Sequence, residues 1–404
     1  MLTTLRYARS ALVSLFGAVA LVACGGGGDT TATVVGAPGG GGTGGAGTLR
    51  VALTDAPACG FDHVYITVDR VRVHASSTAS DSDAGWSEVV LNPAQRIDLL
   101  ALTNGVLAEL GQTPLPAGQY TQVRLVLRPN GGGTPANAVV PSATGAEIPL
   151  DTPSATQSGL KLIHPFTVQP NSMADLVLDF DACRSVVRRG NSGRYNLKPV
   201  IAVIPRTTTA IVGTVDPALS GVTVSAQKDG AVVRSTTPNA AGEFVLSGLD
   251  VMRSPFDVVL TANGRASAVI AAVPVTSSVT TRVSTTAAPI MLPTSPMGVA
   301  KGKVLPLDVG AAVRALQAVG TVPKVEIGYD NADAVTGEYA LSLPRDGARL
   351  AAYSTTLPLA FASQNASAAA YTLEAFATGY VTQTKGVTVG AAEVVNDFTL
   401  VLAP

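Results

Sequence analysis

The chain has few charged and few aromatic side chains. Asp, Glu, Lys and Arg together make up 14% of its 404 residues, well below the quarter that is usual for soluble domains. Aromatic residues make up 5%, with a single Trp, and the formal net charge is -1. A chain with so little positive charge lacks the basic surface that nucleic-acid binding requires, so we expect no nucleic-acid partner.

The residue types that catalyse reactions or hold metals are also scarce. The chain has three His and three Cys residues, and the His residues form no H-x-H or H-x-x-x-H pair. It lacks the G-x-S-x-G, H-E-x-x-H and Walker motifs that mark common catalytic and nucleotide sites. We therefore expect a protein that is not an enzyme and that has no resident cofactor, with calcium as the one candidate ion.

The calcium hypothesis depends on four aspartates. Asp179 and Asp181 flank Phe180 on an expected strand, so both carboxylates project from one face. Asp55 and Asp62 lie near the start of the same region. If its first and last strands are neighbours, the four carboxylates could gather around Ca²⁺, which prefers oxygen ligands. The alternative is a solvated strand face together with a turn-forming Asp55.

The N-terminus carries an export signal. Arg6 and Arg9 precede a short apolar run, which is too short to span a bilayer as a helix. The run ends in Leu21-Val22-Ala23-Cys24-Gly25, which resembles the lipobox of bacterial lipoproteins. The resemblance implies removal of residues 1–23 as a signal peptide, lipidation of Cys24, and delivery to the outer membrane, facing either the periplasm or the exterior. Residues 24–47 then form the lipidated Cys and a flexible glycine-rich linker.

The region from residue 48 to 206 has the alternating pattern of β-strands. Val64, Ile66 and Val68 share one parity and Val71 and Val73 the other, which predicts a β-bulge near Asp69-Arg70. Residues 99–110 form the best candidate for a helix or an extended loop. Further strands are expected at Gln122–Leu127, Lys161–Val168, Ala174–Phe180 and Tyr195–Ile204.

Six spaced motifs in this region occur in a characteristic order. They include Thr54-Asp55-Ala56-Pro57, Gly85-Trp86, Leu115-Pro116-Ala117-Gly118-Gln119-Tyr120 and Leu197-Lys198-Pro199. Together they resemble an uncharacterised lipoprotein family, a domain of unknown function that opens on T-D-A-P and closes on L-K-P. The resemblance implies an exported β-sandwich-like domain over residues 48–206 and supplies no activity.

Two aromatic residues in this region are candidates for binding a sugar ring. Trp86 and Tyr120 could each offer a flat face for stacking, if the face is exposed. The alternative is that they pack in the core of the domain, which the low aromatic content favours.

After residue 206 a second pattern begins and then repeats. Gly213-Thr214-Val215 has its counterpart at Gly302-Lys303-Val304, and Gly242-Glu243-Phe244 at Gly337-Glu338-Tyr339. The offset grows from 302 − 213 = 89 to 337 − 242 = 95, and it reaches 115 at Ala262-Asn263-Gly264, so the second copy contains insertions. Both copies resemble carboxypeptidase regulatory-like β-sandwiches, at residues 207–296 and 297–404. The repeat predicts a strand at residues 310–320, although their apolar spacing also fits a helix.

The cysteine count predicts one disulfide. If Cys24 carries lipid, Cys59 and Cys183 are the remaining pair, and the exported compartment is oxidising. The bond would close a loop of 183 − 59 = 124 residues. The alternative is two buried free thiols that pack as small apolar side chains.

Together these features predict an all-β protein with tandem Ig-like or prealbumin-like sandwich domains. The fragments 48–206 and 297–404 are each expected to fold alone. We expect a non-catalytic, envelope-anchored lipoprotein with structural or protein-interaction duties, which meets the membrane through its anchor and an unknown envelope protein or glycan. A carbohydrate-binding surface lipoprotein is the alternative.

Overall fold

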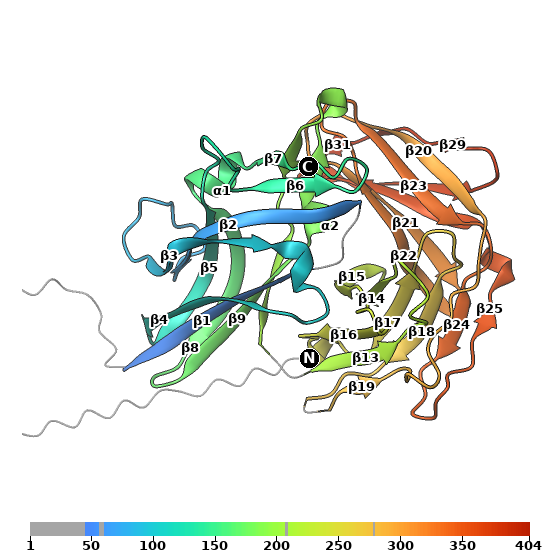
Figure 1. The fold of residues 1–404 in the computed structure, drawn as a ribbon, viewed down its shortest axis with the longest axis horizontal. Coiled ribbons are helices and arrows are strands. Elements are labelled where there is room, and N and C mark those ends of the chain that lie inside the picture. The colour runs from blue at the N-terminus through green and yellow to red at the C-terminus, as the bar shows by residue number, and fades with distance from the viewer. Residues whose placement is uncertain (1–44, 56–59, 207–208, 278) are drawn as a thin grey trace, which may run out of the picture. The chain divides into compact units, whose positions relative to one another are not determined.

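The computed structural model describes residues 45–404, apart from residues 56–59, 207–208 and 278. The predicted all-β class is confirmed, because strands make up most of the regular structure in these residues (Figure 1). The helices are short: α1 (Pro153–Gln157), α2 (Ala182–Ser185) and the 3-10 turns η1 (Leu99–Leu102), η2 (Gly190–Ser192), η3 (Val251–Arg253) and η4 (Asn365–Ser367). The predicted signal peptide, Cys24, most of the linker and Cys59 lie outside the described residues.

The first sandwich consists of two sheets. The smaller has the strand order β12-β9-β1-β4, and the larger has the order β10-β11-β7-β6-β2-β5-β8 with β3 paired to β2. The strands are β1 (Ala46–Asp55), β2 (Phe61–His74), β3 (Ser87–Asp98), β4 (Ala108–Pro116), β5 (Gly118–Leu127), β6 (Ala138–Pro141), β7 (Ile148–Asp151), β8 (Leu160–Val168), β9 (Met173–Phe180), β10 (Val186–Arg188), β11 (Tyr195–Leu197) and β12 (Ile201–Pro205). Since β1 runs parallel to β9, the opening and closing segments of this domain are neighbours.

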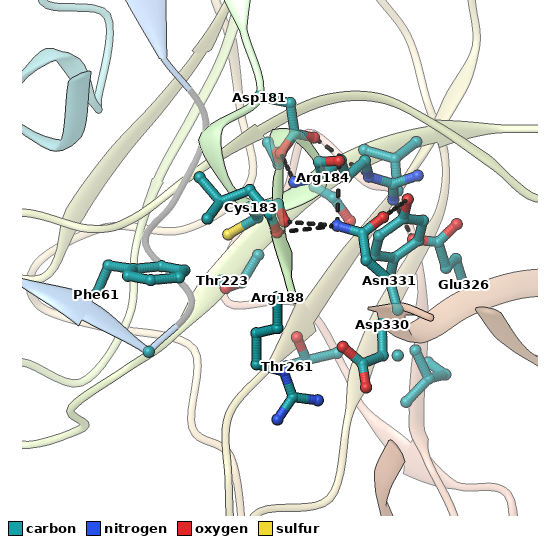
Figure 2. Close-up of a pocket in the computed structure, with 18 of the residues that line it drawn as sticks. Phe61, Asp181, Cys183, Arg184, Arg188, Thr223, Thr261, Glu326, Asp330 and Asn331 are labelled. Atoms are coloured by element: carbon teal, nitrogen blue, oxygen red, sulfur yellow. Dashed lines mark hydrogen bonds and ion pairs between the residues drawn. The ribbon is translucent and has the colours of Figure 1, made fainter. Parts of the chain in front are cut away.

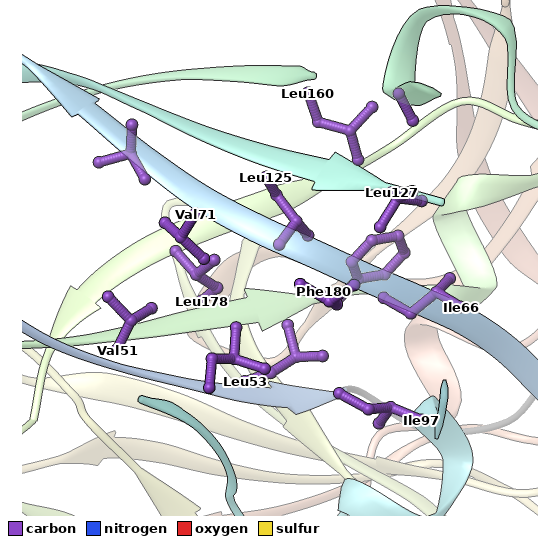
Figure 3. Close-up of a cluster of buried hydrophobic side chains, with 14 of the residues drawn as sticks. Val51, Leu53, Ile66, Val71, Ile97, Leu125, Leu127, Leu160, Leu178 and Phe180 are labelled. Carbon is purple, nitrogen blue, oxygen red and sulfur yellow. The ribbon is translucent and has the colours of Figure 1, made fainter. Parts of the chain in front are cut away.

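Aliphatic side chains from both sheets fill one core between them (Figure 3). Val51 and Phe180 come from the smaller sheet, and Ile66 and Leu125 come from the larger one. All four are fully buried. Burying a side chain of this size stabilises the fold by about 1.5–3 kcal/mol. The burial of these apolar side chains between the two sheets is therefore the main contribution to the stability of the sandwich.

The predicted bulge in β2 is confirmed. The register of β2 shifts between Val68 and Arg70 against both of its neighbours, β3 and β5. The extra residue moves the following side chains to the other face of the strand. As a result Val68 and Val71, which have opposite parity in the sequence, are both fully buried.

Two sequence-based expectations for this domain were partly wrong. Residues 195–204 form two strands in different sheets, because Pro199, which has no N–H to donate, interrupts the ladder. The segment 99–110 forms the single turn η1 and then enters β4. That turn ends where Asn104 and Gly105 adopt positive φ angles of 60° and 80°, which a continuing helix does not allow.

The second sandwich pairs a three-stranded sheet, β16-β13-β19, with a six-stranded sheet, β15-β14-β17-β18-β24-β25. Its own strands are β13 (Ala210–Thr214), β14 (Thr223–Lys228), β15 (Ala231–Thr236), β16 (Glu243–Ser247), β17 (Phe256–Thr261), β18 (Ala268–Val273) and β19 (Thr281–Arg282).

The third sandwich has two four-stranded sheets, β23-β20-β29 with β30 paired to β20, and β22-β21-β26-β28, and also a short ribbon of β27 and β31. The strands are β20 (Met297–Leu305), β21 (Ala312–Val319), β22 (Val322–Asn331), β23 (Glu338–Pro344), β26 (Ala370–Phe376), β27 (Tyr380–Val381), β28 (Gln383–Thr388), β29 (Val394–Val395), β30 (Phe398–Thr399) and β31 (Val401–Leu402). The strand predicted at residues 310–320 is confirmed as β21.

One sheet is shared by the second and third sandwiches. β24 (Arg349–Ala352) and β25 (Ala362–Ser363) belong to the second copy of the repeat, residues 297–404, but β24 pairs in parallel with β18 of the second sandwich (Figure 1). Backbone N–H groups of Arg349 and Tyr353 donate to the carbonyls of Ser267 and Ala271 at 2.8 and 3.1 Å. The insertion in the second copy of the repeat therefore covers the open edge of the preceding sandwich.

Candidate functional site

A cavity of about 470 Å³ lies where the three sandwiches meet. Its wall includes Phe61 at the start of β2, Arg184 of α2, Thr223 of β14 and Glu326 of β22 (Figure 2). Ligand pockets occur preferentially at domain junctions of this kind. This cavity is therefore the candidate functional site.

The short helix α2 is held at both ends by side chains. Asp181 precedes it and accepts a hydrogen bond from the backbone N–H of Arg184 at 3.0 Å. At the other end the Asn331 side-chain amide donates to the carbonyls of Cys183, Arg184 and Val186 at 3.4, 3.1 and 3.3 Å. A helix end leaves such carbonyls without partners inside the helix. The side-chain amide of Asn331, in the third sandwich, thus caps the C-terminal end of a helix in the first sandwich.

Arg184 is the centre of an ion-pair network at the cavity. Its guanidinium group pairs with Asp181 at 3.2 Å and with Glu326 of β22, and it lies 4.2 Å from the centre of the Tyr329 ring. Glu326 also lies 3.7 Å from Arg314, which pairs in turn with Glu374 at 2.7 Å. The network therefore links α2 of the first sandwich to β21, β22 and β26 of the third.

Burial and the neighbouring charges shift the pKa values of this network in opposite directions. It raises the pKa of the Asp181 and Glu326 carboxyls above their ordinary values, although the charge of Arg184 acts in the opposite direction. For Arg184 burial lowers the pKa, but the charges of Glu326 and Asp181 outweigh it and the pKa is raised. Burial also raises the pKa of Tyr329. The guanidinium group and the phenol therefore keep their protons at neutral pH.

A residue of the second sandwich completes the junction. The Gln227 side-chain amide donates to the Glu326 carbonyl at 2.8 Å, and its oxygen accepts from the Glu326 backbone N–H at 2.7 Å. Phe61 and Tyr195 of the first sandwich add an edge-to-face aromatic pair with ring centres 5.5 Å apart. With the hydroxyl groups of Thr223 and Thr261 and the guanidinium group of Arg188 also on the wall, the cavity can bind a polar molecule.

The four aspartates of the calcium hypothesis each have a partner other than a metal ion in the described residues. Asp181 caps α2, and Asp62 accepts a hydrogen bond from the Ser142 hydroxyl at 2.6 Å. Asp55 accepts from the backbone N–H of Ala182 at 2.9 Å, and Asp179 pairs with Arg234 of the second sandwich. No group of three or more His, Cys, Asp or Glu residues in the described part of the chain is arranged to hold a metal ion. The predicted calcium site is therefore not assembled.

Of the two cysteines in the predicted disulfide, the structure describes only Cys183. Cys183 is disulfide-bonded and lies in the cavity wall. Cys59, the partner that the cysteine count predicts, lies outside the described residues, as does the lipidation candidate Cys24.

The two sugar-stacking candidates are engaged by other parts of the protein. The guanidinium groups of Arg72 and Arg124 lie 4.5 and 4.8 Å from the centre of the Trp86 ring, and its indole N–H donates to the Ser80 carbonyl at 2.9 Å. Tyr120 is 8% exposed, and its hydroxyl donates to the Pro116 carbonyl at 3.0 Å. Both rings are therefore engaged by neighbouring groups of the protein, and a sugar-stacking role for these residues stays a prediction.

Several residues of the junction were not anticipated from the sequence. Arg184, Arg234, Glu326 and Asn331 belong to no motif, and the partners lie far apart in the chain, with 326 − 184 = 142 positions between Arg184 and Glu326. Arg234, Glu326 and Asn331 lie in strands and Arg184 lies in α2, and no local pattern distinguishes these four residues from the other charged and amide residues of the chain.

Fold and junction together define an all-β protein of tandem sandwich domains. Within it, residues 46–199 contain a domain of unknown function, DUF4382, which covers nearly the whole first sandwich. No curated protein matches the sequence. One solved structure that matches is that of the Streptococcal ancillary pilin, with 11% identity over 88% of this chain and 99% of that chain. Its TM-score of 0.16 is too low to support any conclusion about fold or function.

No helix in the described residues has both the length and the apolar character needed to cross a bilayer.

Proposed function

We propose that the protein is a non-catalytic lipoprotein of the bacterial envelope, in which three β-sandwiches form one stiff module for structural or protein-interaction duties. The observation that carries this proposal is the way the sandwiches are joined. Domains of one chain usually meet through small polar interfaces and move relative to one another. Here a continuous sheet joins the second sandwich to the third, and buried ion pairs join the first to both.

The contacts between the sandwiches bury charged side chains that would otherwise be exposed to water. The side chains of Asp179 and Arg234, which link the first and second sandwiches, are 13% and 7% exposed. Breaking such a pair leaves an uncompensated buried charge, which is strongly unfavourable. A stiff rod or platform is what a spacer or docking module requires. The resemblance of the second and third sandwiches to carboxypeptidase regulatory-like domains supports the same role.

The stiffness of the module can be tested by measuring the distance between a label on the first sandwich and a label on the second. Spin labels at the exposed positions Ser82 and Met291 report on the first and second sandwiches. We expect one narrow distance distribution by double electron–electron resonance, which broadens when Arg234 is replaced by Met. A broad distribution in the unaltered protein would contradict a stiff module.

The anchoring part of the proposal rests on the lipobox resemblance at Cys24. Cys24→Ala should release the protein from washed membranes, because the acyl chains are lost. Cys183→Ser is the matched control, since it removes a sulfur but leaves the lipobox intact, and it should remain in the membrane fraction. If Cys24→Ala stays with the membrane, a different anchor is present and this part of the proposal fails.

A further inference from the structure

A second cavity, of about 500 Å³, lies between the connector that follows the second sandwich and the insertion of the third. Residues 288–293 form one wall, and Pro358, Leu359 and Phe361, from the loop between β24 and β25, form the opposite wall. The cavity exists only because the insertion docks on the preceding sandwich. Its volume lies within the range of roughly 300–1,000 Å³ typical of small-molecule pockets.

The charges on this cavity are all positive. Arg265 and Arg349 both line it, and the described residues of its wall include no Asp or Glu. The other lining residues are mainly aliphatic side chains and prolines, together with Phe361 and Ser284. Both arginines are half-buried. Placing a cation partly out of water against an apolar surface is unfavourable unless a partner compensates the charge.

Backbone carbonyl groups hold both arginines in place. Arg265 donates from Nη1 to the Leu292 carbonyl at 3.2 Å, and Arg349 donates from Nη2 to the Phe361 carbonyl at 2.8 Å. Each guanidinium group has five N–H donors, so most of them remain available. The Nε of Arg349 is buried and has no hydrogen-bond partner among the described residues. A buried donor of this kind calls for a partner that the protein itself does not provide.

We propose that this cavity binds a small amphiphilic acid, in which a carboxylate lies between the two arginines and an aliphatic chain lies against the prolines, Leu359 and Phe361. A carboxylate accepts several hydrogen bonds and matches the planar fork of a guanidinium group. The apolar wall excludes a fully polar anion as the preferred ligand, since it would leave that surface unused. This site is independent of the junction cavity and of the proposed envelope role.

The test uses octanoate as the probe and the mature chain without lipid, residues 25–404, so that no acyl group of the protein competes. Isothermal titration calorimetry should show saturable binding of one octanoate per chain. We expect 1-octanol, which lacks the charge, and acetate, which lacks the chain, to bind at least about tenfold more weakly. Octanoate affinity should also fall as NaCl is raised, because the attraction is partly electrostatic.

Variants locate the site. Arg265→Gln combined with Arg349→Gln should weaken octanoate binding by about tenfold or more, whereas Arg282→Gln, at an exposed arginine outside the cavity, should change it less than about twofold. Circular dichroism confirms that each variant is folded. If the double variant unfolds, Arg349→Lys serves instead, because it keeps the charge and loses the fork, and it should bind several-fold more weakly than the unaltered chain.

Three results would each overturn the proposal. The first is the absence of saturable octanoate binding. The second is octanol binding as tight as octanoate binding, which would make the cavity merely apolar. The third is unchanged octanoate affinity in the folded arginine variants.

Discussion

Individual charged residues form ion pairs between the three sandwiches of this protein. With only 14% charged residues, the chain still places Asp179, Arg234, Arg184 and Glu326 in buried or nearly buried positions between sandwiches. Moving these groups out of water costs free energy, which close oppositely charged partners offset. In the structure each of these charges has an oppositely charged partner from a neighbouring sandwich.

Removing one member of such a pair should be costly. Arg234→Met leaves the carboxylate of Asp179 buried without its cation, and we expect a loss of about 3–5 kcal/mol in the free energy of unfolding at pH 7. Adding Asp179→Leu should recover most of this loss, because both charges are then absent. Urea unfolding of the two single variants and the double variant measures the coupling. Equal and additive losses in the two single variants would show that the residues do not interact.

Asp333 makes the joint between the first and third sandwiches sensitive to acid. Burial raises the pKa of its carboxyl, but hydrogen bonds from the backbone N–H groups of Thr336, Val335 and Gly190 outweigh this, and the pKa lies below its ordinary 3.8. Gly190 belongs to the first sandwich and donates at 2.8 and 2.7 Å. Because the folded pKa is lower than the unfolded one, this contribution is complete above about pH 4 and is lost as the pH falls through the folded pKa.

Asp333→Asn should therefore destabilise the protein by about 1.5–3 kcal/mol at neutral pH, because it replaces a charged acceptor. The difference between variant and unaltered protein should shrink as the pH is lowered below 4. Chemical unfolding at pH 7 and at pH 3 measures it, with the exposed Asp346→Asn as a control that should have little effect at either pH. A difference that stays constant with pH would mean that the Asp333 carboxylate is not responsible.

At the scale of elements, the most informative feature is the insertion in the second repeat. The offset between the copies grows by 115 − 95 = 20 residues between the G-E-[FY] motif and the A-x-G motif. In the structure this interval contains β24 and β25. Since β24 lies between β18 and β25 in the shared sheet, its backbone is bonded on both sides. The insertion therefore covers the edge of β18 and leaves the two-residue strand β25 at the edge of the sheet. Very short edge strands limit unwanted pairing with other chains.

A proline in β24 should weaken this sheet. Ala351→Pro removes the N–H that lies between the bonded donors of Arg349 and Tyr353, at a position that is 2% exposed. We expect a loss of about 3 kcal/mol and faster amide hydrogen exchange in β18. Ala360→Pro, in the exposed loop before β25, is the matched control and should leave β18 protected. If β18 exchanges equally slowly in both variants, β24 does not protect it.

At the scale of the whole molecule, the three sandwiches have separate but touching cores. The core of the third sandwich includes Val259 and Val269, which belong to β17 and β18 of the second. The second core in turn is contacted by Tyr353, Leu359 and Phe361 of the insertion. The sequence-based expectation that residues 297–404 fold alone therefore needs revision, because part of that segment completes its neighbour.

We now expect residues 297–404 alone to unfold about 10 °C lower than residues 209–404. In the shorter fragment β24 and β25 have lost β18, so limited proteolysis should cut first within residues 346–364. In the longer fragment the same segment should resist cleavage. Differential scanning calorimetry measures the first outcome and mass spectrometry of the fragments the second. Equal melting temperatures and equal resistance would show that the third sandwich is self-sufficient.

The sequence alone determined the local features of this protein. The change of parity in β2 predicted its bulge, the internal repeat predicted β21, and the alternation of apolar residues predicted the all-β class. These features could be predicted because a half-buried strand buries every second side chain, so residues close together in the sequence show the pattern. The motifs of the first domain also agree with the DUF4382 domain at residues 46–199.

Only the tertiary structure decided what the elements bury and bind. Apolar alternation shows that a strand has a buried face but not which strand or domain covers it, so the destination of the 20-residue insertion was not predictable. The sequence predicted that Asp179 and Asp181 share one face of a strand. In the structure Asp179 forms an ion pair with Arg234, whereas Asp181 caps α2 and pairs with Arg184. The physical reason is that the ion pairs at a junction join groups far apart in the chain, 55 residues for Asp179 and Arg234 and 142 residues for Arg184 and Glu326. Packing brings such groups together, and no local pattern in the sequence predicts which of them meet.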